Sequence, residues 1–364
     1  MAKRLLSTAV ATAIVGMTST FCIGVASAQP SELGSSRSMT EFNPRTTTTG
    51  HGEPKSGFWQ AFAASLTQPR MAPEGVNDWS CKPTSEHPTP VVLVHGTWEN
   101  AYANWAAMGP ELKKAGHCVF ALNYGENNLL HGGGVGSIMP NTFGLKPIEE
   151  SARELSSFVD EVLAATDAKK VDLVGHSQGG VVIRQYAKEE GGATPDDPSK
   201  NKIRRIVTLG ATHNGTTMDM RANPDEKPDN GQEDTSDSSE NDTTGSSEKD
   251  SSSSADTFAS SEGNILKDLE KNITGASAVQ QKKDSPFIRG LNEGGYTQPG
   301  IDYTIIATAY DQITTPFRST FFEAGPGAHV DNILVQDDHP NDRSDHLTMS
   351  YSPNVIALVK KALD

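Results

Sequence analysis

Cysteine is scarce in this sequence, with three residues in a chain of 364. Neither Cys81 nor Cys118 has another ligand-type residue at zinc-site spacing, so we expect no metal. Basic residues are outnumbered, 31 Lys and Arg against 46 Asp and Glu, and they form no patch that could neutralise phosphates. These shortages argue against a nucleic-acid partner, and we expect no cofactor.

One long apolar run is present, at residues 10–25, after a basic pair at positions 3 and 4 and before Ala26-Ser27-Ala28. This layout is typical of a secretory signal peptide at residues 1–28, with cleavage near Ala28. The alternative is a retained membrane anchor, which is disfavoured because polar residues at 18–20 interrupt a run that is already short for a bilayer. We therefore expect a secreted protein, extracellular or associated with the cell envelope.

Cys22 lies in the predicted signal segment, which leaves Cys81 and Cys118 in the mature chain. In a secreted protein, an even pair separated by one strand and one helix indicates a disulfide. Such a bond contributes about 3–4 kcal/mol by restricting the unfolded chain. The alternative is two buried thiols.

Large apolar residues are missing from residues 221–257, which contain no Val, Ile, Leu, Met or aromatic side chain. Such a tract cannot bury enough apolar surface to offset its ordering entropy, so we predict a disordered, acidic, Ser-rich insertion at about 219–262. Residues 225–256 hold eleven acidic residues against Lys227 and Lys249, which is nine of the net charge of −15. The insertion is either a solvated tether or a tract that affects access to a site or retention at the cell surface.

Strand and helix patterns alternate from residue 90 onward, which predicts one α/β domain at residues 79–364. The strands are continuous apolar runs, as is typical of a parallel sheet covered on both faces. We therefore predict a mostly parallel sheet in a three-layer α/β/α sandwich, preceded by a polar N-terminal extension at residues 29–78. The predicted strands are 90–95, 118–122, 171–174, 203–209, 303–309 and 330–335. The predicted helices are 110–115, 147–165, 179–188 and 353–363, with one or two amphipathic turns at 58–66.

The segment Gly-His-Ser-Gln-Gly-Gly joins the strand at 171–174 to the helix at 179–188. A sharp strand-to-helix turn strains the residue at its tip, and Gly175 and Gly179 remove side chains that would collide there. One interpretation is a plain turn in which Ser177 is incidental. The other, favoured by the strand before it and the helix after it, is that the turn exposes the Ser177 hydroxyl as a nucleophile.

A serine nucleophile needs a base and an acid that orients the base. On such a sheet both follow the serine in chain order, each just after the carboxyl end of a later strand. Asp311 follows the strand at 303–309, and His346 lies between the last strand and the last helix, so we predict Asp311 as the acid and His346 as the base. The weaker candidates are His176, His213, Asp337, Asp338, His339, Asp342 and Asp345.

Acyl transfer through a serine also requires hydrogen-bond donors for the developing oxyanion. We predict the backbone N–H of Gln178, directly after the serine, and the backbone N–H of Thr97, which follows the strand at 90–95. The alternative for the second donor is the run His131-Gly132-Gly133-Gly134, which does not directly follow a strand. We expect this run to form a flexible loop near the acyl site.

Several ordered blocks between Trp79 and Asp364 resemble one known family. The blocks are VVLVHGTWENAYANWAAMGPELKKAGHCVFALNYG, GHSQGG, TLGATHNGTT, ATAYDQITTPF and SDHLTMSYSPNVIALVKKALD. Together they are similar to the secreted triacylglycerol lipases of actinobacteria, the lipase class 2 family of the α/β-hydrolase superfamily. The resemblance implies the α/β-hydrolase fold, ester hydrolysis and an apolar cleft for acyl chains. By that match, the family's nucleophile, acid and base fall on Ser177, Asp311 and His346.

Two features depart from that family. The acidic insertion, which follows Gly215-Thr216-Thr217, is longer and more polar than the resemblance leads us to expect. Family members also often carry a further cysteine near the last strand, where this chain has Gln336-Asp337-Asp338-His339. We therefore predict at most one disulfide.

The sequence thus predicts a secreted serine ester hydrolase, a triacylglycerol lipase that forms an acyl-enzyme on Ser177. Its expected partners are a lipid or other ester substrate and, transiently, a lipid–water interface or the cell envelope, and we expect a monomer. Two alternatives keep the same residues: an acyltransferase that moves acyl groups onto alcohols, and a short-chain carboxylesterase. A third alternative is a non-catalytic binding protein on a hydrolase scaffold.

Overall fold

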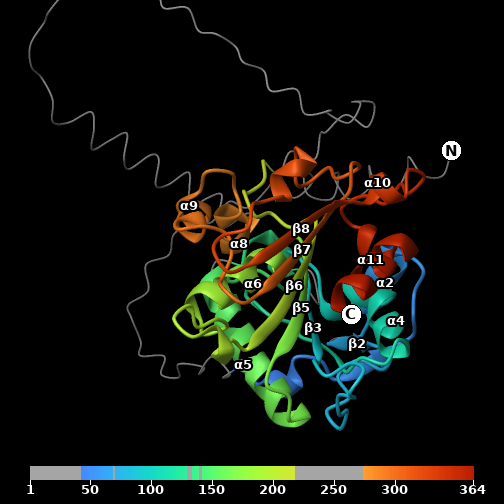
Figure 1. The fold of residues 1–364 in the computed structure, drawn as a ribbon. Coiled ribbons are helices and arrows are strands. Elements are labelled where there is room, and N and C mark those ends of the chain that lie inside the picture. Colours follow the sequence, from blue (N-terminus) through green and yellow to red (C-terminus); the bar gives the residue numbers. More distant parts are fainter. Residues whose placement is uncertain (1–41, 69, 129–132, 139–141, 218–273) are drawn as a thin grey trace, which may run out of the picture. The chain divides into compact units, whose positions relative to one another are not determined.

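The computed structural model describes residues 42–68, 70–128, 133–138, 142–217 and 274–364 (Figure 1). All of them belong to one compact unit that begins at Phe42. The predicted signal peptide and the predicted acidic insertion lie outside the described residues.

Six parallel strands form the central sheet, in the order β4-β3-β5-β6-β7-β8 (Figure 1). They are β3 (Val91–Val94), β4 (Val119–Ala121), β5 (Val171–His176), β6 (Ile203–Leu209), β7 (Asp302–Ala307) and β8 (His329–Leu334). Because the strands are parallel, all their carboxyl ends lie at the same edge of the sheet. The predicted parallel sheet is confirmed, and this edge is the place to look for the predicted site residues.

Helices cover both faces of the sheet. Within β3, Val92 and Val94 pack in one apolar cluster, while Val91 and Leu93 pack in another on the opposite face. This double burial explains why the strands are continuous apolar runs. The first face is covered by α5 (Ile148–Thr166), α6 (Gln178–Glu189) and α9 (Pro286–Asn292), and the second by α3 (Ala101–Trp105), α4 (Met108–Lys114) and α11 (Pro353–Leu363). Several short helical elements lie between these strands and helices or before them. They are α8 (Ala276–Gln280), α10 (Val335–Asp338), η1 (Pro44–Thr46), η3 (Val135–Ile138), η4 (Pro198–Lys200), η5 (Phe317–Thr320) and η6 (Met349–Tyr351).

Residues 42–78, which fall in the predicted N-terminal extension, belong to the same compact unit as the residues of the predicted α/β domain that follow them. They form a small parallel sheet of β1 (Gly50–Gly52) and β2 (Met71–Pro73), and the helix α2 (Phe58–Ser65). Phe58 and Met71 are buried in a cluster with Tyr102 of α3. The segment is polar in composition, but its few buried apolar side chains pack against the rest of the domain.

The chain on either side of residues 218–273 is joined by backbone hydrogen bonds. The Thr216 N–H donates to the Gln281 carbonyl at 2.8 Å, and the Lys283 N–H donates to the Thr216 carbonyl at 3.0 Å. In addition, β6, which precedes residues 218–273, pairs directly with β7, which follows them. The two parts of the domain are therefore held together by contacts that do not involve the residues between them.

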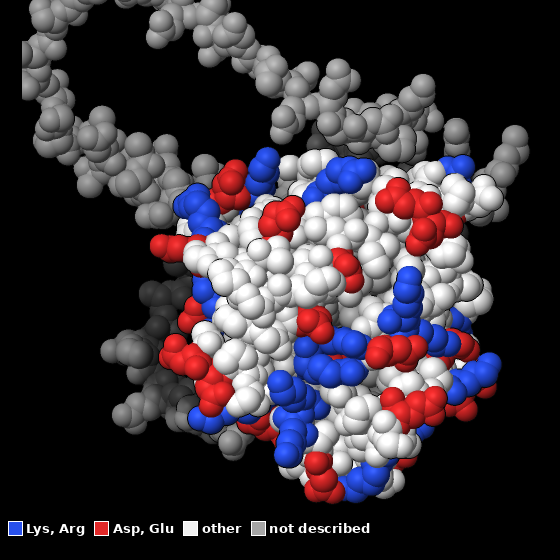
Figure 2. Space-filling model, viewed as in Figure 1, with Lys and Arg blue, Asp and Glu red and all other residues white. Residues whose placement is uncertain are grey.

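Acidic and basic side chains are intermixed on the face shown in Figure 2. Some form ion pairs, such as Lys360 Nζ with Glu111 Oε2 at 2.9 Å. By contrast, the acidic excess of residues 225–256 lies outside the described residues. Among the helices that the structure describes, none combines the length and the apolar character that crossing a bilayer requires.

Candidate active site

Ser177 lies in the turn between β5 and α6. Its backbone has φ 53° and ψ −124°, a conformation that is uncommon for a residue with a side chain. The Ser177 N–H donates to the carbonyl of Leu209, at the end of β6 (2.9 Å). Strained backbone of this kind persists only where the surrounding structure imposes it. Here β6 on one side and the first turn of α6 on the other impose it.

Two glycines make the turn sterically feasible. A Cβ at Gly179 would lie 2.1 Å from the Val94 oxygen, and one at Gly175 would lie 2.7 Å from the Gly180 nitrogen. Both gaps are too short for a real Cβ, so any other residue would force β3 or α6 to move. The glycines around Ser177 are therefore required by the close approach of β3, β5 and α6.

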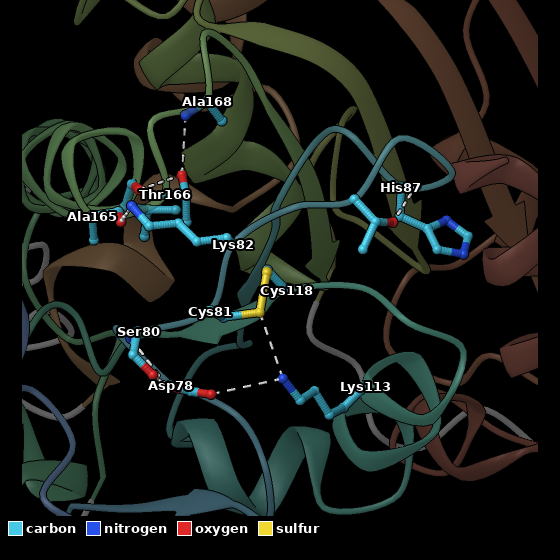
Figure 3. The surroundings of a disulfide bond; sticks show 12 residues. Asp78, Ser80, Cys81, Lys82, His87, Lys113, Cys118, Ala165, Thr166 and Ala168 are labelled. Atoms are coloured by element: carbon cyan, nitrogen blue, oxygen red, sulfur yellow. Dashed lines mark hydrogen bonds and ion pairs between the residues drawn. A yellow bond between two sulfur atoms is a disulfide. The ribbon is translucent and has the colours of Figure 1, made fainter.

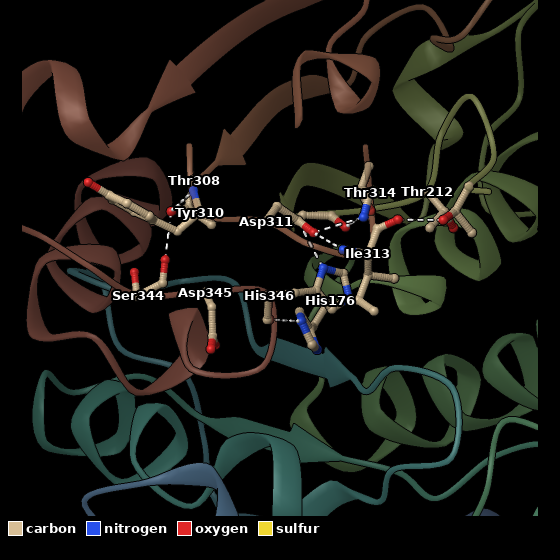
Figure 4. A network of polar contacts seen from close by, with 12 residues as sticks. His176, Thr212, Thr308, Tyr310, Asp311, Ile313, Thr314, Ser344, Asp345 and His346 are labelled. Atoms are coloured by element: carbon tan, nitrogen blue, oxygen red, sulfur yellow. Dashed lines mark hydrogen bonds and ion pairs between the residues drawn. The ribbon is translucent and has the colours of Figure 1, made fainter. Parts of the chain in front are cut away.

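His346 and Asp311 form a buried pair at the carboxyl edge of the sheet (Figure 4). His346 Nδ1 lies 2.9 Å from Asp311 Oδ2. The other carboxylate oxygen, Oδ1, accepts the backbone N–H groups of Ile313 and Thr314, both at 2.8 Å. One oxygen thus fixes the carboxylate, and the other orients the imidazole.

Gly210 brings this pair against the serine turn. It follows Leu209, whose carbonyl accepts the Ser177 N–H, and it has φ 51°. A Cβ at Gly210 would lie 2.8 Å from Asp311 Oδ2 and 3.2 Å from His346 Nδ1. The structure therefore gathers the predicted nucleophile, acid and base around the ends of β5, β6 and β7.

The electrostatics of the pair suit a general base. Burial acts to lower the pKa of His346, but the charge of Asp311 and its hydrogen bond more than reverse this, so the pKa lies above its ordinary value. Because a carboxylate can only accept, Nδ1 carries the hydrogen toward Asp311. The other ring nitrogen, Nε2, is then the atom of His346 that can take a proton.

His176, directly before Ser177, contacts the backbone of His346. Its Nε2–H donates to the His346 carbonyl at 2.8 Å, and the two ring centroids are 4.9 Å apart. Its Nδ1 lies 3.3 Å from Glu99 Oε2 and 3.0 Å from Asn104 Nδ2. His176 was one of the weaker candidates for the base. Its place in the structure is to hold the main chain of the predicted base.

Glu99 is a residue of this region that the sequence argument missed. It is 4% exposed, and its Oε2 accepts the Gly96 N–H at 3.1 Å. Burial acts to raise the pKa of Glu99, but His176, His95 and the Gly96 N–H together hold it below its ordinary value, so the carboxylate is charged at neutral pH. Glu99 therefore links the loop that carries Thr97 to the histidine behind the base. The only signal in the sequence was a single acidic residue soon after His95-Gly96, and this does not reveal that Glu99 contacts His176.

The two predicted oxyanion donors belong to residues whose side chains are hydrogen-bonded to each other. Thr97 Oγ1 donates to Gln178 Oε1 at 2.8 Å. Gln281 Nε2 donates to Thr97 Oγ1 at 2.9 Å, and Thr212 Oγ1 donates to Gln281 Oε1 at 2.9 Å. Sequence reasoning missed Gln281 and Thr212, because they come from segments on either side of residues 218–273.

The backbone N–H groups of Thr97 and Gln178 donate to no protein acceptor among the described residues. The N–H of Gln178 is in the first turn of α6, where backbone donors have no partner within the helix and the helix dipole favours negative charge. This arrangement is chemically able to stabilise an oxyanion.

The loop that carries His346 is anchored by Asp342. The Asp342 carboxylate accepts the Ser344 N–H at 2.8 Å, the Ser352 hydroxyl at 2.5 Å and Asn354 Nδ2 at 2.9 Å. Burial acts to raise the pKa of Asp342, but hydrogen bonds from Ser344 and Ser352 lower it to about 2. Asp342 was a weaker candidate for the catalytic acid, and its contacts fix the two ends of the loop around His346.

The remaining candidates have other surroundings. His213 is fully buried, and its Nε2 lies 3.1 Å from Thr208 Oγ1. Burial and then Arg184 hold the pKa of His213 well below its ordinary value. Asp337 and Asp338 are exposed on α10, His339 is partly exposed after it, and Asp345 accepts the Thr348 N–H at 2.9 Å. His131 and Gly132 of the alternative oxyanion run lie outside the described residues.

Cys81 and Cys118 form a disulfide across 37 residues (Figure 3). Cys118 directly precedes β4, so the bond lies at the amino edge of the sheet, opposite the edge that carries Ser177. Both sulfurs are oxidised, so neither is available as a metal ligand. The predicted disulfide is therefore present, rather than two buried thiols.

Known proteins resemble this chain in sequence. The family described as alpha/beta hydrolase fold matches residues 89–324, which is more than half of the chain. Two triacylglycerol lipases, from Pseudarthrobacter phenanthrenivorans and Burkholderia plantarii, are each 30% identical over 132 residues, or 35% of this chain. These matches cover 34% and 30% of the two lipases, so the chain spans about a third of the length of these curated relatives.

A solved structure agrees on the fold. Lipase B of Aspergillus fumigatus is similar with a TM-score of 0.52 and 17% identity, over 80% of this chain and 55% of that one. At this identity the similarity concerns the fold alone. Together with the six-stranded parallel sheet and the match over residues 89–324, it shows that this chain belongs to the alpha/beta hydrolase fold family.

Proposed function

We propose that this protein hydrolyses carboxylic esters of lipids, as a triacylglycerol lipase, through an acyl-enzyme on Ser177. The observation that carries the proposal is the buried His346–Asp311 pair, placed against the strained turn of Ser177. The name triacylglycerol lipase on the two relatives at 30% identity supports the choice of lipid esters as substrates.

In the proposed reaction, His346 Nε2 takes the Ser177 proton while Oγ attacks the ester carbonyl carbon. Asp311 stabilises the imidazolium that forms, and the N–H groups of Thr97 and Gln178 hold the oxyanion. His346 then protonates the leaving alcohol, and the acyl group stays on Ser177. Water repeats these steps on the acyl-enzyme and releases the carboxylic acid.

The test is hydrolysis of soluble esters of increasing chain length and of emulsified long-chain triacylglycerol. We expect the wild-type protein to cleave the emulsion, and Ser177→Ala and His346→Ala to lose at least about a thousandfold in rate. His339→Ala is the matched control, because it removes a histidine from the same stretch of chain without touching the pair. It should keep wild-type activity.

Other outcomes would replace the proposal. Cleavage of short soluble esters alone would indicate a carboxylesterase, and new esters formed with an added alcohol would indicate an acyltransferase. Unchanged hydrolysis by Ser177→Ala would show that the serine is only part of a turn.

We also propose that the protein is secreted after cleavage near Ala28. Support comes from the apolar run at residues 10–25 and from the Cys81–Cys118 disulfide, a bond typical of oxidising compartments. Expression of the full-length chain in a secreting bacterial host should yield protein in the medium that begins at Gln29, as read by N-terminal sequencing. Uncleaved protein that stays with the membrane would contradict this proposal.

A further inference from the structure

Three potential metal ligands meet far from Ser177 in the chain's fold. The histidine cluster consists of His87, His117 and Asp364, whose ligand atoms all lie within 4.8 Å of one another. His87 lies in the loop after Cys81, His117 lies directly before Cys118, the disulfide cysteine that precedes β4, and Asp364 follows α11. The cluster is therefore near the amino edge of the sheet, opposite the candidate active site.

His117 is the unusual member of the cluster. It is 2% exposed, and neither of its ring nitrogens has a hydrogen-bond partner among the described residues. A neutral imidazole carries one donor and one acceptor, and burying such groups without partners is unfavourable. Buried polar groups without a partner are rare, so an ion bound by His117 would explain this one.

The His87 ring lies against His117, with ring centroids 4.0 Å apart. Its Nδ1 is 3.9 Å from the Asp364 Oδ1 atom. Because neither ring nitrogen of His117 is used in a hydrogen bond among the described residues, a lone pair of the imidazole is available to an ion. Two imidazoles and a carboxylate are ligands that suit Zn²⁺ and similar divalent transition metals.

The main chain holds these segments together. The Cys81–Cys118 bond joins the loop of His87 to the residue after His117 (Figure 3). Gly116 has φ 103°, and a Cβ there would lie 3.0 Å from His87 Cδ2, so the glycine allows the His87 ring to approach. The segments are therefore close in the fold before any ion binds.

Residue 364 is also held in place. Arg204 Nη2 donates to the Leu363 carbonyl at 2.7 Å. The cations near the cluster are themselves paired: Arg204 contacts both Asp172 oxygens, at 2.9 and 2.5 Å, and Lys360 contacts Glu111 at 2.9 Å. Their charges are balanced locally, which reduces repulsion of a bound cation.

We propose that His87, His117 and Asp364 bind one divalent transition-metal ion, with Zn²⁺ as the best-matched ion and water as a fourth ligand. Tetrahedral Zn²⁺ needs ligand atoms about 3.3 Å apart, given bonds of about 2.0–2.1 Å. His87 and Asp364 are the more exposed members, so their side chains turn toward His117 on binding. The ion would join α11 to the disulfide loop and to β4.

The test uses untagged, chelator-treated protein and Zn²⁺ alone in a calorimetric titration. We expect the wild-type protein to bind one Zn²⁺ per chain, and His87→Ala and Asp364→Asn each to weaken the Kd at least about tenfold, as loss of one ligand should. His329→Ala is the matched control: His329 also lies beside a carboxylate, 3.7 Å from Asp331 Oδ1, but it belongs to no cluster of three potential metal ligands among the described residues. It should bind Zn²⁺ as the wild-type protein does.

A second readout is the melting temperature, which also shows whether the variants fold. Zn²⁺ at about a hundred times the wild-type Kd should raise the wild-type Tm by about 4 °C and the Tm of His87→Ala by no more than about 2 °C, because the variant binds at least about tenfold more weakly. The proposal is overturned if the wild-type protein shows no saturable binding, or if His87→Ala and Asp364→Asn bind as tightly as His329→Ala. Neither readout depends on catalysis, so the result is independent of the proposed hydrolase activity.

Discussion

Two buried histidines, His346 and His117, have opposite surroundings. Their exposed fractions are nearly equal, at 3% and 2%. His346 Nδ1 contacts Asp311 at 2.9 Å and its carbonyl accepts a hydrogen bond from His176, whereas the ring of His117 has no hydrogen-bond partner among the described residues. Burial alone therefore does not determine what a histidine can do.

The pKa values of the two rings show that the neighbouring charged groups determine what each histidine can do. Burial acts to lower the pKa of both rings. At His117 the neighbouring His87 lowers it further, to about 4, while at His346 the Asp311 carboxylate reverses the effect of burial. The neighbouring group thus distinguishes a ring that can take a proton near neutral pH from one that stays neutral there. The first is suited to catalysis and the second to metal binding.

The largest expected effect comes from removing the Asp311 carboxylate. Asp311→Asn should lower kcat/KM for a soluble ester by about 10³–10⁴-fold, because the imidazole loses its orientation and the stabilisation of its charged form. A base works in its neutral form, so wild-type activity should fall as pH drops through the His346 pKa, which lies above about 6.5. In Asp311→Asn the burial effect remains while the largest opposing effect is lost, so the pKa of His346 should fall and the residual activity should persist to lower pH. Profiles of kcat/KM against pH measure both changes.

Asp338→Asn provides the matched control for this comparison. Asp338 is an exposed acid on α10, close to His346 in sequence but outside the pair. Equal losses in the two variants, or an acid limb that stays where it is in Asp311→Asn, would contradict the assignment of Asp311.

The next effect concerns the region of His117. Replacing both Cys81 and Cys118 by Ala should lower the free energy of unfolding by about 3–4 kcal/mol, because the unfolded chain gains freedom across the 37-residue loop. Since the disulfide and Ser177 lie at opposite edges of the sheet, kcat/KM of the folded variant should not change. Urea denaturation and ester hydrolysis below the unfolding transition measure the two quantities. A folded variant with reduced kcat/KM would show that the regions are coupled.

The smallest effect is expected at His117 itself. In the presence of a chelator, His117→Leu should change the free energy of unfolding by no more than about 1 kcal/mol, because a polar ring without partners is replaced by an apolar side chain. The same variant should lose the stabilisation by Zn²⁺. Urea denaturation with chelator and with Zn²⁺ separates the two cases. A loss of several kcal/mol in chelator would mean that the ring has partners that support the fold without metal.

The sheet was predictable because its strands are buried on both faces. The strand at 203–209 and the helix at 353–363 were predicted at their observed bounds, and the other predicted strands and helices differ by a few residues at their ends. In contrast, α3 was missed, because all five of its residues, Ala101–Trp105, are buried. A fully buried helix has no polar face, so it shows no helical period in the sequence.

The candidate site also contains residues that the sequence predicted and residues that it did not. Chain order and strand ends were enough to propose Ser177, Asp311 and His346, because a parallel sheet brings such positions to one edge. The contacts of Glu99 and Gln281 depend on how loops from distant segments pack, and no periodicity reports that. The histidine cluster escaped for a related reason: zinc spacing was sought among the cysteines, whereas its ligands come from separate segments that meet in the fold.

The backbone bridge between Thr216 and Gln281 has a consequence for the covalent continuity of the chain. Together with the pairing of β6 and β7, it holds the two sides of residues 218–273 against each other without a peptide link. A protease cut between those positions should therefore leave a non-covalent enzyme made of two polypeptides. Residues up to 217 and residues from 274 could equally be produced separately, as halves of a split protein that reassemble through the sheet.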